Sequence, residues 1–137
     1  MLLSSSKYMN KSMLIGRLTA SPELKKTPSD KSVTSFTLAV NRKYKNQDGE
    51  KSTDFISVVS WGKQAEFLVS YAKKGSLISV EGEIRTRSYT DKKGEKRYLT
   101  EVLCTSFEIL ESRAAQALRE NNFDSIDVDL AEEELPF

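Results

Sequence analysis

The sequence predicts an all-β fold, in which five strands form a small closed barrel with one helix between the third and fourth strands. Three observations favour this class. Short runs alternate apolar and polar residues, only one segment of the body has a strong helical period, and no parallel strand–helix–strand unit is repeated. The 137 residues suffice for one domain with a single modest core.

The first two strands are expected before residue 42. A β-like run covers Ser12–Leu18, and in the turn-rich stretch that follows we expect residues 23–26 to pair briefly. Residues 33–41 then alternate, with Phe36 and Leu38 on the same side. A period of two is expected of a half-buried strand.

A polar loop separates the second strand from the third. Residues 42–53 contain an Asp-Gly pair, which is a hairpin signal, and six charged residues, so this loop should project into water. The third strand covers residues 54–61. Both of its faces are apolar, because Val58 points to one side while Phe55 and Trp61 point to the other.

The second half of the body is predicted as a helix and two long strands. Residues 63–72 have apolar side chains at helical spacing and end in Lys-Lys-Gly, a favourable C-terminal stop. The fourth strand, residues 77–89, turns Ile84 inward and is expected to have a bend or a bulge at Gly82. The last strand covers residues 97–110. Five strands with the helix in this position are typical of the oligonucleotide-binding (OB) fold.

The chain divides into four expected regions. Residues 1–9 form a disordered extension, which is either a start-site choice or a mobile arm, and residues 10–112 form the barrel. Residues 113–131 are a short linker, which begins as a short helix. Residues 132–137 are an acidic tail, expected to be disordered because it cannot bury a core. The sequence has no secretory leader or membrane-spanning run, so we expect a cytoplasmic, nucleoid-associated protein.

Charge is distributed unevenly along the chain. Residues 1–112 carry 19 Lys and Arg against 13 Asp and Glu, a net charge of +6. Residues 113–137 carry 2 against 7, a net charge of −5. Such asymmetry favours a polyanion-binding domain with an interaction tail, although ordinary surface charge also explains +6 on a small domain.

Catalytic, metal and cofactor chemistry lack the residues they need. The chain has no histidine, and its single cysteine, Cys104, lies in an apolar run and is expected to be a buried core thiol. Glu81 and Glu83 share a strand face, but solvated surface charge explains this pair better than a metal site. We therefore expect a binding protein with no catalytic residue, metal or cofactor.

Aromatic residues stand beside cations in three segments. These are Arg42-Lys43-Tyr44-Lys45, Trp61-Gly62-Lys63 and Arg85-Thr86-Arg87-Ser88-Tyr89. Unpaired nucleic acid offers bases that stack on flat rings and phosphates that pair with cations, so this interleaving suits both. Phe55 and Trp61 could instead fill gaps in the core, whereas Tyr44 and Tyr89 are poor core residues.

From residue 10 to 113 the chain resembles bacterial single-stranded-DNA-binding proteins. The matching segments are NK at 10–11, IGRL at 15–18, SFTLAV at 35–40, DFISVV at 54–59, WGK at 61–63, KKGS at 73–76, EG at 81–82, RTRSY at 85–89 and TEV at 100–102. The last six residues resemble the family's acidic tail, which closes in Pro-Phe. The short linker makes the chain similar to the shorter, second such protein of naturally transformable Gram-positive bacteria, which accompanies DNA uptake.

The resemblance implies an OB-fold homotetramer that wraps single-stranded DNA around its outside with little sequence preference. It also implies which residues make the contacts. The base-stacking positions are Tyr44, Phe55, Trp61 and Tyr89, and the phosphate-contacting positions are Arg85, Arg87, Lys63 and Lys74. Arg42 and Lys43 join them as cations beside Tyr44. For Lys63 and Lys74, a solvated surface lysine is an equally good interpretation.

The acidic terminus is predicted to recruit replication, recombination and repair proteins. Its residues are Glu132, Glu133, Glu134, Leu135, Pro136 and Phe137. Carboxylates followed by a stiff bend, an apolar ring and a free α-carboxylate suit a shallow apolar pocket rimmed by Lys and Arg. A tail that only aids solubility is the alternative, but it gives no reason for a terminal phenylalanine.

Two other functions are compatible with the body of the chain. An OB-fold RNA chaperone would use the same rings and cations, and the acidic Pro-Phe terminus favours DNA over it. A structural adaptor would use the aromatic face as a protein interface. Salt separates the adaptor from the nucleic-acid binders, because binding a polyanion releases counterions and weakens steeply as salt is added.

Overall fold

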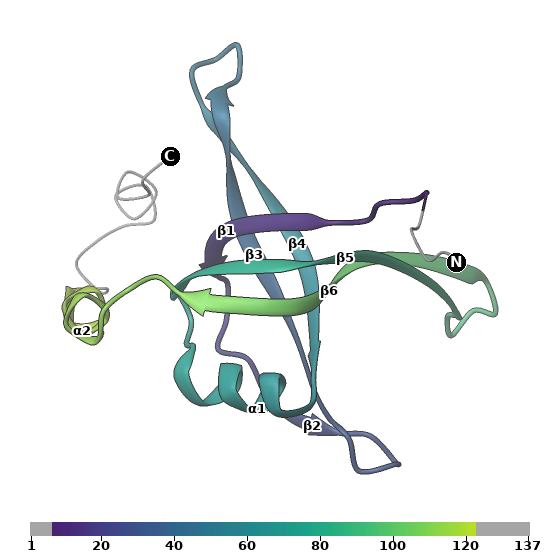
Figure 1. Cartoon of the computed structure of the whole chain (residues 1–137). Coiled ribbons are helices and arrows are strands. Elements are labelled where there is room, and N and C mark those ends of the chain that lie inside the picture. The colour runs from purple at the N-terminus through teal and green to yellow at the C-terminus, as the bar shows by residue number, and fades with distance from the viewer. Residues whose placement is uncertain (1–6, 123–137) are drawn as a thin grey trace.

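The computed structural model describes residues 7–122 and consists of a strongly bent sheet closed into a barrel, with two helices (Figure 1). The elements in chain order are β1 (Ser12–Leu18), β2 (Lys25–Lys26), β3 (Ser32–Lys45), β4 (Lys51–Trp61), α1 (Gly62–Tyr71), β5 (Leu77–Thr90), β6 (Lys96–Ile109) and α2 (Arg113–Asn122). The predicted five-strand barrel with one helix between its third and fourth long strands is confirmed, and β2 is the brief pairing expected near residue 25.

The barrel closes where β1 turns from one neighbour to another. The sheet order is β1-β5-β6-β4-β3-β2, and β1 also pairs with β3 at Arg17 and Leu18. Between the two hairpins of the sheet, β4 and β6 meet in a short parallel contact at Val58 and Val102. Gly82 lies at a register shift between β5 and β6, and a Cβ there would collide with the backbone of β6. The bend or bulge predicted at this glycine is therefore confirmed as a register shift, and close approach of two strands explains the need for glycine.

The core fills the barrel with the inward side chains that the alternation predicts. It comprises Leu18, Phe36, Leu38, Val58, Leu68, Ala72, Ile78, Val80, Val102 and Cys104. Burial raises the pKa of the Cys104 thiol to about 11, as expected of a core cysteine and not of a reactive one. The inward placement of Ile84 was wrong: this side chain is 48% exposed, because β5 leaves the barrel at this point.

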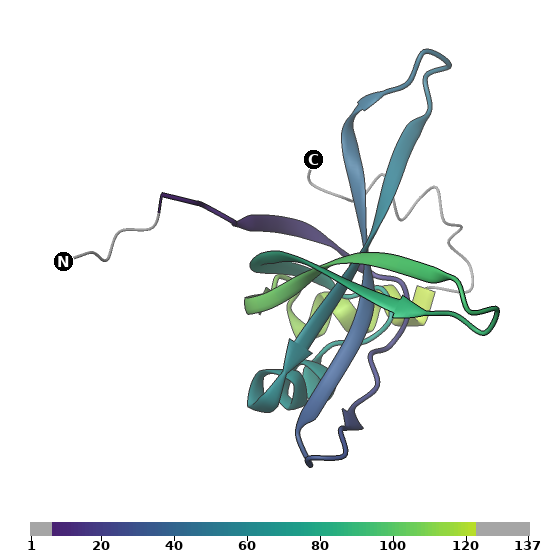
Figure 2. The ribbon, with the colours of Figure 1, turned by 90° about the vertical axis from the view of Figure 1, so that its right-hand side faces the viewer.

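Two hairpins extend beyond the barrel as arms, in different directions (Figures 1 and 2). One is the far end of β5 and β6. The other is the upper end of β3 and β4, where strand structure continues to Lys45 and resumes at Lys51. The prediction of a loop over residues 42–53 was therefore wrong except for residues 46–50. This segment is exposed on both faces, so its sequence shows no alternation of apolar and polar residues. Two strands can nevertheless pair by backbone hydrogen bonds with both faces in water. The projection of this segment into water is as expected.

Helix α2 follows the last strand at the opposite end of the barrel from the β5–β6 hairpin (Figure 1). Ser112 Oγ accepts a hydrogen bond from the amide of Ala115, which is the contact of an N-cap. The helix confirms that the segment after the barrel begins as predicted. No described helix has the length and apolar character needed to cross a membrane. The acidic tail and the first six residues lie outside the described part of the chain.

Candidate nucleic-acid interface

The two aromatic residues of β4 face solvent. Phe55 is 67% exposed and Trp61 is 45% exposed, whereas Val58 on the opposite face is fully buried. The alternative in which these rings fill the core is therefore wrong. Six residues of extended chain place the two rings about 20 Å apart along one face, a span suited to an extended ligand.

This exposed face continues across β6 to β5. Val59 of β4 is in register with Leu103 of β6, and Leu103 is in register with Glu83 of β5. Because paired residues point to the same side of a sheet, the residues that alternate from Glu83 along β5 lie on the same outer surface. We call this surface the aromatic–cationic face, and it comprises Phe55, Trp61, Arg85, Arg87 and Tyr89.

The β3–β4 hairpin carries further residues that the sequence predicts as contacts. Tyr44 is 84% exposed, and Lys43 beside it is exposed as well. Arg42 donates two hydrogen bonds to the Asp54 carboxylate across the hairpin, at 3.1 and 3.0 Å. This guanidinium, chiefly through its hydrogen bond, holds the pKa of Asp54 below its usual range.

The arginines of the face also have carboxylate partners. Arg85 Nη2 lies 2.7 Å from Glu83 Oε2, and Arg87 Nε lies 3.0 Å from Glu101 Oε1. The Arg85–Glu83 pair is exposed on both sides, so it contributes little to stability and is screened by salt. In the second pair Arg87 is 59% exposed, but Glu101 is only 11% exposed. Each guanidinium is therefore oriented on the surface, while a phosphate can compete for it with the neighbouring carboxylate.

Three lysines surround Trp61, and sequence reasoning identified only one of them. Trp61 and Lys63 line a surface hollow of about 400 Å³ together with Lys26 at the end of β2 and Lys31 in the turn between β2 and β3. Asp30 and Glu66 line the same hollow. Lys26 Nζ also donates to Ser32 Oγ at 2.9 Å. The signal available in the sequence was the clustering of lysines around the Pro-Ser-Asp turn, but their distance from Trp61 depends on the fold.

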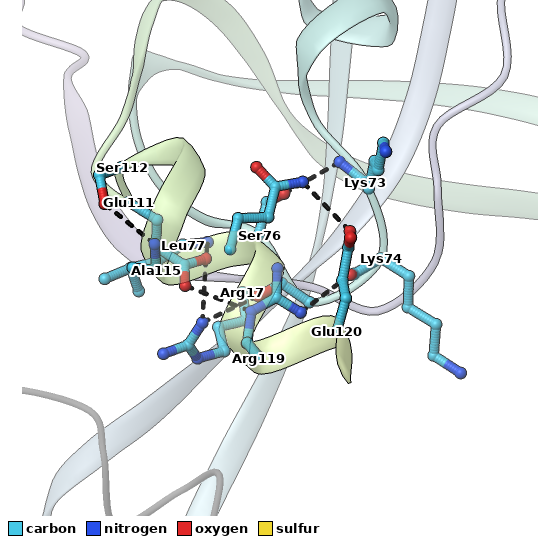
Figure 3. A network of polar contacts seen from close by, with 12 residues as sticks. Arg17, Lys73, Lys74, Ser76, Leu77, Glu111, Ser112, Ala115, Arg119 and Glu120 are labelled. Atoms are coloured by element: carbon cyan, nitrogen blue, oxygen red, sulfur yellow. Dashed lines mark hydrogen bonds and ion pairs between the residues drawn. The ribbon is translucent and has the colours of Figure 1, made fainter. Parts of the chain in front are cut away.

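Lys74 lies apart from these cations, in the turn between α1 and β5. Its amide donates to Ser21 Oγ at 3.0 Å, and its carbonyl accepts from Arg119 Nη1 at 3.3 Å (Figure 3). These contacts place it beside α2. The predicted phosphate contact of Lys74 therefore has less structural support than that of Lys63.

Tyr98 is an exposed aromatic residue that sequence reasoning missed. It lies on β6, is 77% exposed, and has the Lys96 ammonium 5.5 Å from its ring centre. The combination of ring and cation is the pattern used above for the other aromatic residues, so the signal was present in Lys96-Arg97-Tyr98. Within residues 7–122, no three metal-ligating side chains gather closely enough to hold a metal ion.

A profile of the single-strand binding protein family matches residues 9–110. The chain belongs to this family. Membership makes it a binding protein and not an enzyme. It is 60% identical over 130 residues to Single-stranded DNA-binding protein 2 of Streptococcus agalactiae serotype V, and 61% identical over 130 residues to Single-stranded DNA-binding protein 1 of Streptococcus pyogenes serotype M6. Each alignment covers 93% of this chain and 98% of the relative.

A third relative differs in length. The Single-stranded DNA-binding protein of Streptococcus pneumoniae serotype 4 is 52% identical over 108 residues, which cover 79% of this chain but only 69% of the relative. The chain is therefore similar in extent to the first two relatives and shorter than the third. This pattern is consistent with a second, short member of the family.

Proposed function

We propose that this protein binds single-stranded DNA without sequence preference along the aromatic–cationic face. The observation that carries the proposal is the solvent exposure of Phe55 and Trp61 on one strand face, continuous with Arg85 and Arg87. Bases stack on the rings and phosphates pair with the guanidinium groups and with Lys63. Stacking tolerates any base because every base has a π-face, so the binding is general. The names of the relatives support DNA as the ligand.

Trp61 is the only tryptophan of the chain and therefore reports on this site directly. We expect dT oligonucleotides to quench its emission, with a saturation point that gives the site size. The affinity should fall steeply as salt is added, by about 0.7 logarithmic units per logarithmic unit of salt for each phosphate contact. A titration that leaves the emission unchanged, or an affinity insensitive to salt, contradicts the proposal. A matched series of rU oligonucleotides tests the RNA alternative.

We also propose that residues 132–137 recruit replication, recombination and repair proteins. Three carboxylates followed by an apolar Leu-Pro-Phe end support a small pocket with a basic rim as the partner site. Deleting Phe137 alone should abolish capture of these proteins while DNA affinity stays nearly unchanged. Capture of the full set by the deletion variant would show that the terminus has another role.

Copies of the chain are proposed to associate into a homotetramer. Among the described residues β1 pairs with β3 only at Arg17 and Leu18, so its first residues present an open strand edge. Met13 is 73% exposed beside this edge. An open edge with exposed apolar side chains favours pairing with a second copy. Light scattering should give four times the mass of the chain, and a stable monomer would overturn this proposal.

A role beside DNA uptake is proposed from the short linker and from the extent shared with the short relatives. Deleting the gene in its host should lower the frequency of natural transformation while growth continues. Loss of growth with normal transformation would instead assign the protein to replication.

A further inference from the structure

The hairpin formed by β5 and β6 has two solvent-exposed faces. β1 pairs with β5 only as far as Gly82, and the Asn10 side chain bonds the backbone of Ile84. On the other side, β4 meets β6 only at Val102 and Leu103. Among the described residues, 85–100 therefore form a two-stranded arm with no third strand. Figure 2 shows this arm extending away from the barrel. We call it the β5–β6 arm.

The register distributes the aromatic residues over both faces of the arm. Tyr89 is opposite Arg97 on the aromatic–cationic face, whereas Tyr98 is opposite Ser88 on the other face. Small hydroxyl side chains surround Tyr98, because Ser88 and the Thr86–Thr100 pair share its face. The ring is 77% exposed, more than the 49% of Tyr89. A large ring surrounded by small residues leaves its flat surface open to a ligand.

The lysines near Tyr98 differ from the arginines of the arm in their ion pairs among the described residues. Arg85, Arg87 and Arg97 each form an ion pair on or beside the aromatic–cationic face. Within residues 7–122, no ion pair involves Lys96 or the two lysines of the turn, Lys92 and Lys93. Lys96 Nζ lies over the Tyr98 ring, 5.5 Å from its centre, so a base that stacks on this side of the ring must displace the ammonium towards its own phosphate. This face therefore combines a stacking ring with an ammonium group available to a phosphate.

The charge of the arm favours a polyanion over a second copy of the chain. Residues 85–100 contain six Lys and Arg against two Asp and Glu. Two such arms repel each other, whereas a phosphate backbone is attracted to both faces. An apolar protein partner would in addition leave the Lys96 charge without compensation.

We propose that Tyr98 and Lys96 form a second stacking platform, so that one DNA strand contacts both faces of the β5–β6 arm and passes around it. This inference rests on the proposed function, because it extends the path of the same ligand beyond Tyr89. Tyr98 then takes up bases that follow those held on the aromatic–cationic face. The DNA strand thus bends around the β5–β6 arm. The Tyr98 face binds only oligonucleotides long enough to extend past Tyr89.

The test moves the fluorescent reporter to the new site. Trp61→Phe removes the only tryptophan, and Tyr98→Trp, Tyr89→Trp or Leu118→Trp is then added to separate copies of that variant. Leu118 is a matched control, since it is 63% exposed but lies on α2 at the other end of the barrel (Figure 1). On saturation with a dT oligonucleotide of about 35 nucleotides, several times an OB-fold site, we expect quenching for Tyr98→Trp and Tyr89→Trp but not for Leu118→Trp. An oligonucleotide of about 8 nucleotides should affect Tyr89→Trp only.

Affinity measurements complete the test. Tyr98→Ala should weaken binding of the long oligonucleotide about tenfold, Tyr98→Phe should restore it, and neither should change the melting temperature by more than a few degrees. Unchanged emission of Tyr98→Trp while Tyr89→Trp is quenched would overturn this inference and leave the proposed function intact. Emission of Tyr98→Trp that depends on protein concentration without DNA would assign the face to a contact between copies and also overturn it. If no reporter responds and no DNA binds, the proposed function itself fails.

Discussion

Arginines pair with carboxylates at two ends of this molecule, in opposite surroundings. At the end covered by α2, Arg17 and Arg119 both contact Glu111, at 3.3 and 3.2 Å, and all three side chains are only 11–16% exposed (Figure 3). On the aromatic–cationic face, Arg85 and Arg87 are 58% and 59% exposed. Water screens the contacts of these two open guanidinium groups more than those of Arg17 and Arg119, although Glu101, the partner of Arg87, is itself only 11% exposed. The buried cluster of Arg17, Glu111 and Arg119, which we call the α2 joint, therefore stabilises the fold. The exposed arginines can instead exchange their carboxylate partners for a ligand.

Several hydrogen bonds hold the cluster of Arg17, Glu111 and Arg119, although Arg17 Nε and Arg119 Nη2 are buried without a partner among the described residues. Glu111 Oε1 also accepts from the amide of Leu77 at 2.8 Å, and Arg17 donates to the carbonyl of Gly75 at 2.9 Å. Gly75 has a φ of +85°, and a Cβ there would collide with the Arg119 guanidinium. A buried carboxylate with this many partners ties the end of β6, the start of β5 and α2 together.

Removing the shared carboxylate should have the largest effect. Glu111→Ala leaves two buried guanidinium groups without their partner and should lower the free energy of unfolding by about 3–5 kcal/mol, measured by urea denaturation. Glu108→Ala, an exposed carboxylate on β6, is the control and should change it by less than about 0.5 kcal/mol. Equal effects of the two substitutions would show that burial does not distinguish the α2 joint.

Neutralising the exposed arginines should affect DNA and not folding. We expect Arg85→Gln with Arg87→Gln to reduce the slope of log affinity against log salt by about 1 to 2 units, because two phosphate contacts are lost. Urea denaturation should show little change. A weaker affinity with an unchanged slope would mean that these residues do not contact phosphates.

Removing a competing carboxylate should act in the opposite direction. Glu101→Gln keeps the shape of the side chain but frees Arg87 from its ion pair, so the affinity for dT oligonucleotides at low salt should rise about two- to fivefold. Glu108→Gln makes the same charge change on the same strand and should have a smaller effect. An affinity that falls on Glu101→Gln would indicate that the carboxylate serves to orient Arg87 for binding.

The smallest effect concerns the pH dependence of the Arg42–Asp54 pair. Because the pKa of Asp54 is lowered in the folded protein, the pair stabilises the fold above the ordinary pKa of aspartate, and this contribution is lost as the pH falls through the lowered value. A carboxyl NMR titration should show Asp54 titrating below the usual range, and Arg42→Gln should return it towards that range. If Asp54 titrates identically in both proteins, the Arg42–Asp54 ion pair does not form in solution.

The barrel was predictable from the sequence because burial of one face imposes a period of two. Phe36 and Leu38 obey this period, and so does the separation of Val58 from Phe55 and Trp61. The β3–β4 hairpin was mistaken for a loop because both of its faces are solvated, which removes the period. Ile84 was placed inward because the alternation continues past the point where β5 loses its neighbour β1.

The sequence predicts which residue types form the candidate site, but it does not predict their ion-pair partners. Rings beside cations identify Trp61, Arg87 and Tyr89 from sequence alone. The partner of Arg87 is Glu101, 14 positions away, and its contact depends on the register of a hairpin. The α2 joint is even harder to predict from the sequence, since Arg17 and Glu111 are separated by 94 positions. No local pattern carries information of that range.

If the aromatic–cationic face holds unpaired DNA by stacking, two truncations of exposed rings should differ in their effect. Trp61→Ala and Phe67→Ala each remove one exposed ring, and Phe67, 56% exposed on α1 beside Tyr71, is not part of that face. We measure the affinity for poly(dT) by fluorescence anisotropy and the fold by circular dichroism. Trp61→Ala should weaken binding by about 1–3 kcal/mol per bound platform while the chain stays folded, and Phe67→Ala should leave binding unchanged. Equal affinities for both variants and the unaltered protein would contradict the claim.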